Sequence, residues 1–161
     1  MEAAQTMVRD NGILTIGENA SFGTFIKIVS SKSITIKNNL LASLECLFFD
    51  TDFHFMINTI NHEFRNNCKL VIGENCWIGN RTSILKGTIL PDHCIVGSNS
   101  LCNKDYKSIV KENSVIQGSP AKLIKENISS INSKSAENKL NRIFWNSIGE
   151  KTSILFEDLN T

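Results

Sequence analysis

Apolar residues recur at every sixth position along two stretches of the chain, which has 161 residues. The first series of these anchors comprises Ile16, Phe22, Ile28, Ile34, Leu40 and Cys46. The second series comprises Ile72, Ile78, Ile84, Leu90, Val96 and Cys102. Neither an α-helix nor an ordinary strand has this period, but a coil of three short parallel strands does, because each strand with its corner uses six residues. The pattern therefore predicts stacked triangular coils of about eighteen residues, with the anchors facing the axis.

Small and turn-forming residues follow the anchors of the second series. Glycine or proline stands directly after four of them, at Gly73, Gly79, Pro91 and Gly97. The fourth residue after an anchor is small, as at Cys76, Thr82, Thr88, Cys94 and Ser100. Glycine and proline suit tight corners, and small side chains fit where the sides of a narrow coil converge. The first series is less regular, and after Cys102 the frame slips by one residue and resumes at Ile109 and Val115.

The period breaks over residues 49–71, which predicts a loop extruded from the coil. We expect residues 1–125 to form an all-β domain, a parallel β-helix of hexapeptide repeats. Residues 126–161 form a C-terminal tail or cap, in which apolar residues at helical spacing predict a short helix. The extruded loop is the expected place for a functional site, because loops on a rigid scaffold commonly carry binding and catalysis.

Composition and charge exclude several classes of partner. The formal net charge of +1 argues against a nucleic-acid surface or a polybasic membrane patch. No apolar run is long enough to span a bilayer, and the charged N-terminal residues show no secretory signal. We therefore expect a cytoplasmic protein with no membrane span.

The five cysteines allow two interpretations. Cys76 and Cys94 are one predicted coil apart and should stack, which would suit a disulfide or a metal pair. However, they occupy small inward slots, and a buried cysteine behaves as a small hydrophobic residue. Because no C-x-x-C pair is present either, we expect buried thiols and no metal.

His54 is the candidate catalytic residue of the extruded loop. It follows Asp52 by two positions and Asp50 by four, and side chains two apart share a face of an extended segment. A carboxylate beside an imidazole fixes its tautomer and assists general-base catalysis. The spacing alone is also compatible with a loop histidine of no special role.

Four segments resemble the hexapeptide-repeat O-acetyltransferases, and in particular the branch that acetylates bacterial surface polysaccharides and simple sugars such as maltose and galactosides. Two are repeat runs, one that begins at Val71 and contains Trp77-Ile78-Gly79-Asn80 and one from Ile95 to Asp105. The others are the exit sequence Gly118-Ser-Pro-Ala-Lys-Leu-Ile-Lys125 and the loop sequence Phe49-Asp-Thr-Asp-Phe-His54. The likeness is close over residues 46–125, looser over 12–45 and absent from the C-terminal tail.

The resemblance implies a left-handed parallel β-helix, a homotrimer with active sites between subunits, and acetyl-CoA as the donor. By this likeness His54 is the general base that takes the proton from a sugar hydroxyl. Asp52 is the first candidate to orient His54, and Asp50 is the second.

The same resemblance implies a set of residues that bind the donor. Trp77, Gly79, Asn80 and Ser98 correspond to positions beside the thioester and the pantetheine arm. Asn103 and Lys104 match a Thr-Lys pair near the CoA end, although asparagine in place of threonine departs from the pattern. Lys104, Lys122 and Lys125 are candidates to meet the nucleotide phosphates as positive charges.

The predicted function is acetyl transfer from acetyl-CoA to a hydroxyl of a carbohydrate, in bacterial surface polysaccharide biosynthesis. An alternative is transfer to the amine of a nucleotide-linked amino sugar. A carbonic-anhydrase-like zinc site built from His54, His62 and His93 and a non-catalytic β-helix scaffold are further alternatives.

Overall fold

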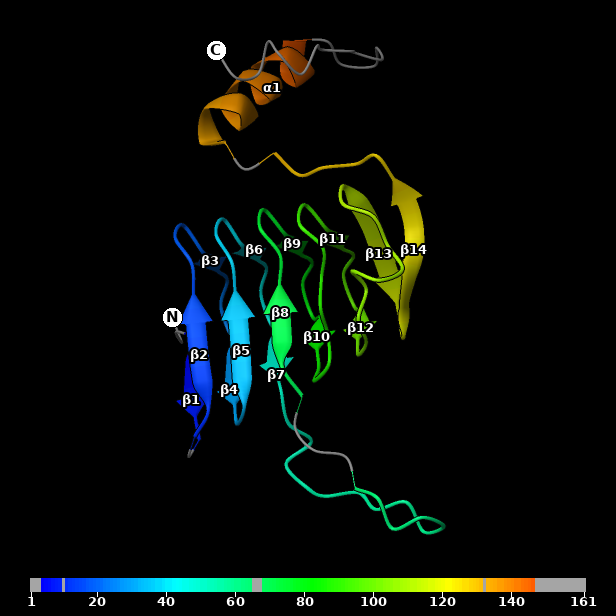
Figure 1. The fold of residues 1–161 in the computed structure, drawn as a ribbon. Helices are drawn as coiled ribbons and strands as arrows, with labels where there is room; N and C mark the ends of the chain where they lie inside the picture. Colours follow the sequence, from blue (N-terminus) through cyan, green and yellow to red (C-terminus); the bar gives the residue numbers. More distant parts are fainter. Residues whose placement is uncertain (1–3, 10, 65–67, 132, 147–161) are drawn as a thin grey trace. The chain divides into compact units, whose positions relative to one another are not determined.

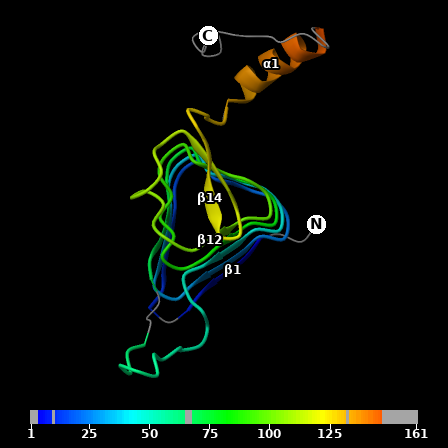
Figure 2. The same cartoon turned by 90° about the vertical axis from the view of Figure 1, so that its right-hand side faces the viewer.

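The computed structural model describes residues 4–9, 11–64, 68–131 and 133–146. Parts of the predicted loop and tail, residues 65–67, 132 and 147–161, lie outside these ranges. The chain divides into two compact units, Met1–Ser130 and Ile131–Thr161. The first unit is a parallel coil of short strands, which Figure 1 shows stacked side by side and Figure 2 shows as a triangle in end view. The predicted parallel β-helix with an extruded loop and a short C-terminal helix is therefore confirmed.

Each coil passes in turn through three sheets, which we call B, C and A. Sheet B contains β2 (Ile13–Ile16), β5 (Ser33–Ile36) and β8 (Leu70–Ile72). Sheet C contains, in spatial order, β14 (Ala121–Glu126), β13 (Ser114–Gly118), β11 (Ile95–Val96), β9 (Trp77–Ile78), β6 (Leu41–Ala42) and β3 (Ser21–Phe22). Sheet A contains β1 (Gln5–Val8), β4 (Lys27–Ser30), β7 (Leu47–Phe49), β10 (Ser83–Ile84) and β12 (Leu101–Cys102). Neighbouring strands in these three sheets are parallel except β13 and β14, which are antiparallel.

The anchors of the second series form the core as predicted. All six are at most 1% exposed, and they stack between the three sheets in one continuous apolar column. Ile84, for example, pairs with Phe48 below it and with Cys102 above it. Burial of branched side chains in this column provides the main driving force for folding, because apolar area removed from water is stabilising.

The predicted eighteen-residue repeat is wrong for the first coils. Ile28 pairs with Phe48, twenty residues later, because β4 and β5 each have four residues where the strands from β6 to β12 have two or three. Cys46 is consequently not in an anchor row. It precedes Leu47, which pairs with Ser83, so that Cys46 lies in the column of small residues beside Thr82.

Two ends of the predicted pattern also differ from the structure. Ile16 is exposed because β2 is the edge strand of sheet B and no coil covers it. After Cys102 the buried positions are Val110 and Ile116 rather than Ile109 and Val115. The six-residue frame therefore shifts by two residues after Cys102, whereas the sequence predicted a shift of one.

Asparagine, not glycine, provides the left-handed backbone angles at one row of corners. Asn19, Asn39 and Asn75 have φ angles of 56°, 59° and 54°, a region that asparagine tolerates better than most residues. Their side chains form a ladder, in which Asn19 donates to Asn39 over 3.2 Å and Asn39 donates to Asn75 over 3.1 Å. These bonds tie successive coils together along the junction of sheets B and C.

The second unit contains α1 (Lys134–Asn146), and Ser133 directly precedes this helix. The Ser133 hydroxyl accepts from the Ala136 N–H over 3.3 Å, as an N-cap side chain does. In the part of the chain that the structure describes, no helix is long and apolar enough to cross a membrane.

All five cysteines lie in the described residues, and none forms a disulfide. Four are buried, and burial raises the pKa of both Cys76 and Cys102 to about 12. Because the thiolate is the reactive form, these side chains act as small apolar residues, as predicted.

We therefore expect one thiol, that of Cys68, to react with Ellman's reagent in the native protein at about pH 8. All five should react after denaturation in guanidinium chloride. Absorbance of the released thionitrobenzoate gives both counts, and a fast second thiol in the native protein would contradict the buried assignment.

Candidate active site

The extruded loop carries a short hairpin, which we call the arm (residues 53–64). Ile57 and Phe64 form an antiparallel bridge, and the Asn58 N–H donates to the Glu63 carbonyl over 2.7 Å. The Asn58 side chain closes the turn by accepting from the Ile60 N–H over 2.8 Å. Figure 1 shows this segment extending from the end of β7, away from the coil. The arm thus has its own hydrogen-bonded structure and leaves the β-helix between sheets A and B.

The arm is unusually apolar for a segment that faces solvent. Phe55 is 82% exposed and Ile60 is 89% exposed. Phe55 packs edge-to-face on Phe64, with 6.0 Å between the ring centroids. Met56 and Ile57 are exposed as well. An apolar surface of this kind commonly marks a contact site for another molecule.

His54 stands at the base of the arm with its imidazole exposed. Within the described residues, no hydrogen bond or ion pair joins it to either candidate carboxylate. Asp52 instead forms an ion pair with Lys86. Its Oδ2 atom makes this contact, so the pairing does not occupy Oδ1.

Asp50, the second candidate to orient His54, is fully buried within the coil. Its carboxylate accepts from the backbone N–H groups of Ser31, Lys32 and Ser33 over 2.7, 2.8 and 2.7 Å. It also accepts from the Ser30 hydroxyl over 3.1 Å. These four bonds close the turn between β4 and β5, which is a structural role.

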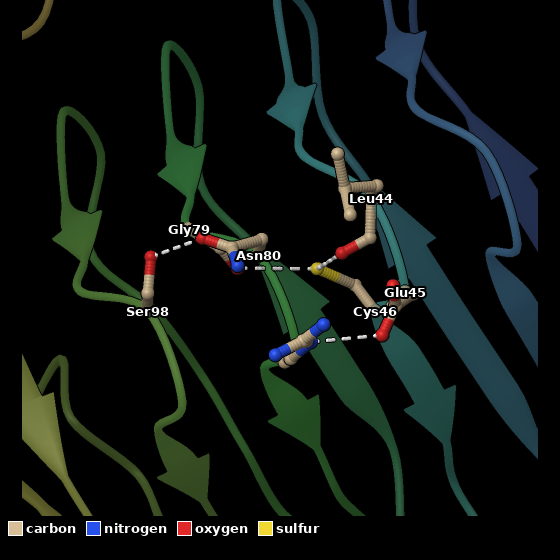
Figure 3. Close-up of polar contacts among 7 residues, drawn as sticks. Leu44, Glu45, Cys46, Gly79, Asn80 and Ser98 are labelled. Carbon is tan, nitrogen blue, oxygen red and sulfur yellow. Dashed lines mark hydrogen bonds and ion pairs between the residues drawn. The ribbon is translucent and has the colours of Figure 1, made fainter.

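The residues predicted beside the thioester lie together on sheet C and at its junction with sheet A. Trp77 in β9 is 40% exposed, and its indole N–H donates to the Ser43 hydroxyl over 3.4 Å. Asn80 follows the same strand, and its side-chain oxygen accepts from the Ser98 hydroxyl over 2.5 Å. Figure 3 shows Ser98 and Asn80 facing one another across adjacent coils, with Gly79 beside them. We call Trp77, Gly79, Asn80 and Ser98 the donor surface.

Gly79 lets adjacent coils approach closely on the donor surface. A Cβ atom at this position would lie 2.6 Å from the Ser98 backbone nitrogen and 2.8 Å from its hydroxyl. The Gly79 carbonyl also accepts from the Cys46 thiol over 3.2 Å, which Figure 3 draws as a dashed line. The same glycine therefore fixes the positions of Asn80 and Ser98.

We expect Gly79→Ala to lower the free energy of unfolding by about 1–3 kcal/mol, as overpacking does in rigid interiors. Thermal unfolding followed by circular dichroism measures this change. Since the nearest atom belongs to the backbone, a second change of Ser98→Ala should not restore stability. A Gly79→Ala protein with an unaltered melting temperature would contradict the close packing of these coils.

The predicted phosphate-binding residues fall into two groups. Lys122 and Lys125 are exposed on β14, in the same sheet as Trp77, and Trp77, Ile95, Val115 and Lys125 lie in one register row. At about 4.8 Å per strand, Trp77 and Lys125 are roughly 14 Å apart across this face. Asn103 and Lys104 follow β12 in sheet A and lie at its far end, away from the donor surface. Lys104 Nζ lies 5.4 Å from the centroid of the Tyr106 ring.

One chain does not bring His54 to the donor surface. The arm leaves at the junction of sheets A and B, whereas the donor surface occupies sheet C and its junction with sheet A. The breadth of sheet A therefore separates the two, and Figure 2 shows the arm at one corner of the triangle. Among the described residues, no group of three or more His, Cys, Asp or Glu side chains is arranged to hold a metal ion.

Lys86 is the residue of this region that the repeat pattern does not indicate. It lies two residues after the anchor Ile84, at a position to which the repeat assigns no particular residue type. A lysine there would ordinarily be assigned to the surface. Only the folded structure places it against Asp52.

Residues 69–104 match the family model described as bacterial transferase hexapeptide (six repeats). The chain is 27% identical over 124 residues to WbbJ of Escherichia coli K12, provisionally named a lipopolysaccharide biosynthesis O-acetyl transferase. That match covers 71% of this chain and 61% of WbbJ. The chain is also 28% identical over 116 residues to galactoside O-acetyltransferase of the same organism, covering 69% of this chain and 53% of the relative. It thus spans about half to three-fifths of the length of these relatives.

Solved structures share the fold. The polySia-specific acetyltransferase NeuO superimposes with a TM-score of 0.69 at 20% identity, covering 89% of this chain and 72% of NeuO. The polysialic acid O-acetyltransferase OatWY superimposes with a TM-score of 0.60 at 24% identity, covering 86% of this chain and 78% of OatWY. At these identities the likeness establishes the β-helix architecture.

Proposed function

We propose that this chain, a hexapeptide-repeat protein of the acyltransferase type, transfers an acetyl group from acetyl-CoA to a hydroxyl of a carbohydrate. The observation that carries the proposal is the arm: a hairpin with a histidine at its base that interrupts an otherwise regular hexapeptide coil. The likeness to two sugar-directed O-acetyltransferases over about 70% of the chain supports the choice of acceptor. Surface polysaccharide biosynthesis is the biological setting that we propose on the same ground.

In the proposed reaction, His54 acts as the general base. A ring nitrogen of its imidazole takes the proton from the sugar hydroxyl as that oxygen attacks the thioester carbonyl. The tetrahedral intermediate then collapses, the carbon–sulfur bond breaks, and the imidazolium returns the proton to the departing CoA thiolate. The exposure of His54 suits this function, because the acceptor must reach the imidazole within hydrogen-bond distance.

The donor surface has the features needed to hold an extended thioester. Trp77 offers an aromatic face, and Gly79 carries no side chain that would block a close approach. The hydrogen bond from Ser98 orients the Asn80 amide, so that its NH₂ group can donate to an oxygen of the donor. Lys122 and Lys125 on the same sheet supply positive charge for phosphate groups. Asn103 and Lys104 lie at the far end of sheet A and are not part of this surface.

We further propose that the active unit is a homotrimer in which the arm of one subunit reaches the donor surface of the next. Two observations support this arrangement: sheet A separates His54 from the donor surface within one chain, and the arm exposes large apolar side chains. A threefold assembly would create three equivalent sites and cover the apolar arms. Because acetyl-CoA is an intracellular metabolite, the reaction would take place in the cytoplasm.

The test begins with calorimetric titration of the purified protein with acetyl-CoA, together with light scattering for its mass and a zinc determination. Transfer of radiolabelled acetyl groups is then measured with free, nucleotide-linked and polymeric sugars. Mild alkali distinguishes the products, since an ester is cleaved and an amide is not. Saturable binding and an alkali-labile product support the proposal. An alkali-stable product would show transfer to an amine, and absence of binding with stoichiometric zinc would favour a metal-dependent hydratase.

A further inference from the structure

Two carboxylates fasten the root of the arm, which we define as residues 50–52, to the coils on either side. Asp50 points into the preceding coil and accepts the four hydrogen bonds that close the turn at residues 30–33. Asp52, two residues later, pairs with Lys86 of the following coil. Thr51 between them is buried, and its hydroxyl accepts from the Phe53 N–H over 3.1 Å. The root is thus attached to the preceding coil through Asp50, to the following coil through Asp52 and to its own chain through Thr51.

The upper attachment depends on Lys86. The backbone around it is fixed, because the Leu85 N–H donates to the Cys102 carbonyl over 2.8 Å and the neighbouring Ile84 belongs to the core. The Lys86 side chain is only 12% exposed and that of Asp52 is 29% exposed. A lysine and a carboxylate that are largely shielded from water attract each other more strongly than an exposed pair. Loss of either partner would leave the other charged and poorly solvated.

We propose that Lys86 is a positioning residue for acetyl transfer, one that holds Asp52 and thereby sets the direction in which the arm presents His54. This inference rests on the proposed function of His54. His54 follows Asp52 by only two residues, a reach of at most about 7 Å, and Phe53 between them turns the chain with a φ angle of 63°. A change in the angle of the root would therefore move the imidazole by ångströms, whereas a general base must lie within about 3 Å of the proton that it takes.

The ion pair is compatible with a second contact of Asp52. Lys86 contacts Oδ2, and Oδ1 forms no hydrogen bond or ion pair with another described residue. The carboxylate can therefore stay paired with Lys86 while Oδ1 faces the imidazole in the assembled site. In that case Lys86 also orients the Asp52 carboxylate toward His54, and the donor surface is unaffected.

The decisive comparison is between Lys86→Met, Lys86→Arg and Lys37→Met. Lys37 forms an ion pair of the same kind with Asp92 over 3.0 Å, also between coils, but at the junction of sheets B and C, away from the arm. For Lys86→Met we expect kcat to fall by about 10- to 100-fold, the size of effect that small misplacement of a catalytic group produces. The KM for acetyl-CoA should stay within about twofold, because the donor surface is untouched. Lys86→Arg should recover most of the rate, and Lys37→Met should keep the wild-type kcat.

Hydrogen exchange provides a readout that does not depend on turnover. Lys86→Met should speed amide exchange in peptides that cover residues 51–64, and Lys37→Met should not. An active wild type with an unchanged kcat in Lys86→Met overturns the inference, as does an equal loss in Lys37→Met. A rise in the KM for acetyl-CoA alone would also overturn it. An inactive wild type overturns the proposed function instead, and exchange then shows whether Lys86 still fixes the arm.

Discussion

Replacement of His54 by alanine is expected to lower kcat for acetyl transfer by about 10²- to 10⁴-fold, the usual contribution of a general base. Binding of acetyl-CoA should be unchanged, because His54 lies at the junction of sheets A and B and the donor surface occupies sheet C. The fold should also be intact, since the imidazole is exposed and takes part in no packing contact of the core. Steady-state kinetics with a sugar acceptor and calorimetry with acetyl-CoA measure the two effects separately.

His62 provides a matched control on the same arm. It is exposed like His54 but lies at the turn, where its φ angle is 56°. Asparagine tolerates this backbone region, so His62→Asn removes the imidazole without adding strain. We expect this variant to retain a kcat close to that of the wild type. If His54→Ala turned over as fast as the wild type, His54 would not be the base; an equal loss in His62→Asn would point to the arm as a whole.

The regular half of the fold could be predicted because each position has one dominant requirement. In the second series the anchor is apolar, glycine or proline often follows it, and the fourth residue after it is small. The positions of Ile78, Gly79 and Thr82 could therefore be predicted directly. The first coils were harder, because two extra residues per coil shift the frame and a six-residue count still lands on apolar side chains. Cys46 shows the difficulty: it is buried, as expected, but in a different column.

The sequence predicts which residues belong to the candidate site better than it predicts the contacts that these residues make. His54, Trp77 and Asn80 are named by local motifs, since each belongs to a short segment with a recognisable sequence. No local motif identifies the partners of Asp50 and Asp52, because these partners come from other coils. They lie about twenty residues before Asp50 and thirty-four residues after Asp52 in the chain. Such contacts depend on how the coils stack, which the spacing of residues within one coil does not reveal. The relation between the arm and the donor surface is more distant still, since it involves a second copy of the chain.

Replacement of Ile84 by asparagine is expected to abolish the folded coil. Ile84 is fully buried in β10 and is stacked between Phe48 and Cys102. Truncation of a large core side chain costs about 2–5 kcal/mol, and a buried amide without partners adds about 1–3 kcal/mol. The sum approaches or exceeds the whole stability of many single domains, which is about 5–15 kcal/mol. Because each coil packs only on its neighbours, the defect would also interrupt the column in its middle.

Circular dichroism, thermal unfolding and the soluble yield on expression report the loss of the coil. Ile109→Asn is the matched control, because it makes the same chemical change at a residue that is 59% exposed. Surface substitutions usually alter the free energy of unfolding by no more than about 0.5 kcal/mol, so this protein should fold and melt like the wild type. The pair also tests the frame after Cys102, since the one-residue slip predicted from the sequence places Ile109 inside and the structure places Val110 there. A folded, heat-stable Ile84→Asn protein would contradict the inward assignment of the anchors. Collapse of Ile109→Asn would instead favour the one-residue slip predicted from the sequence at this end of the coil.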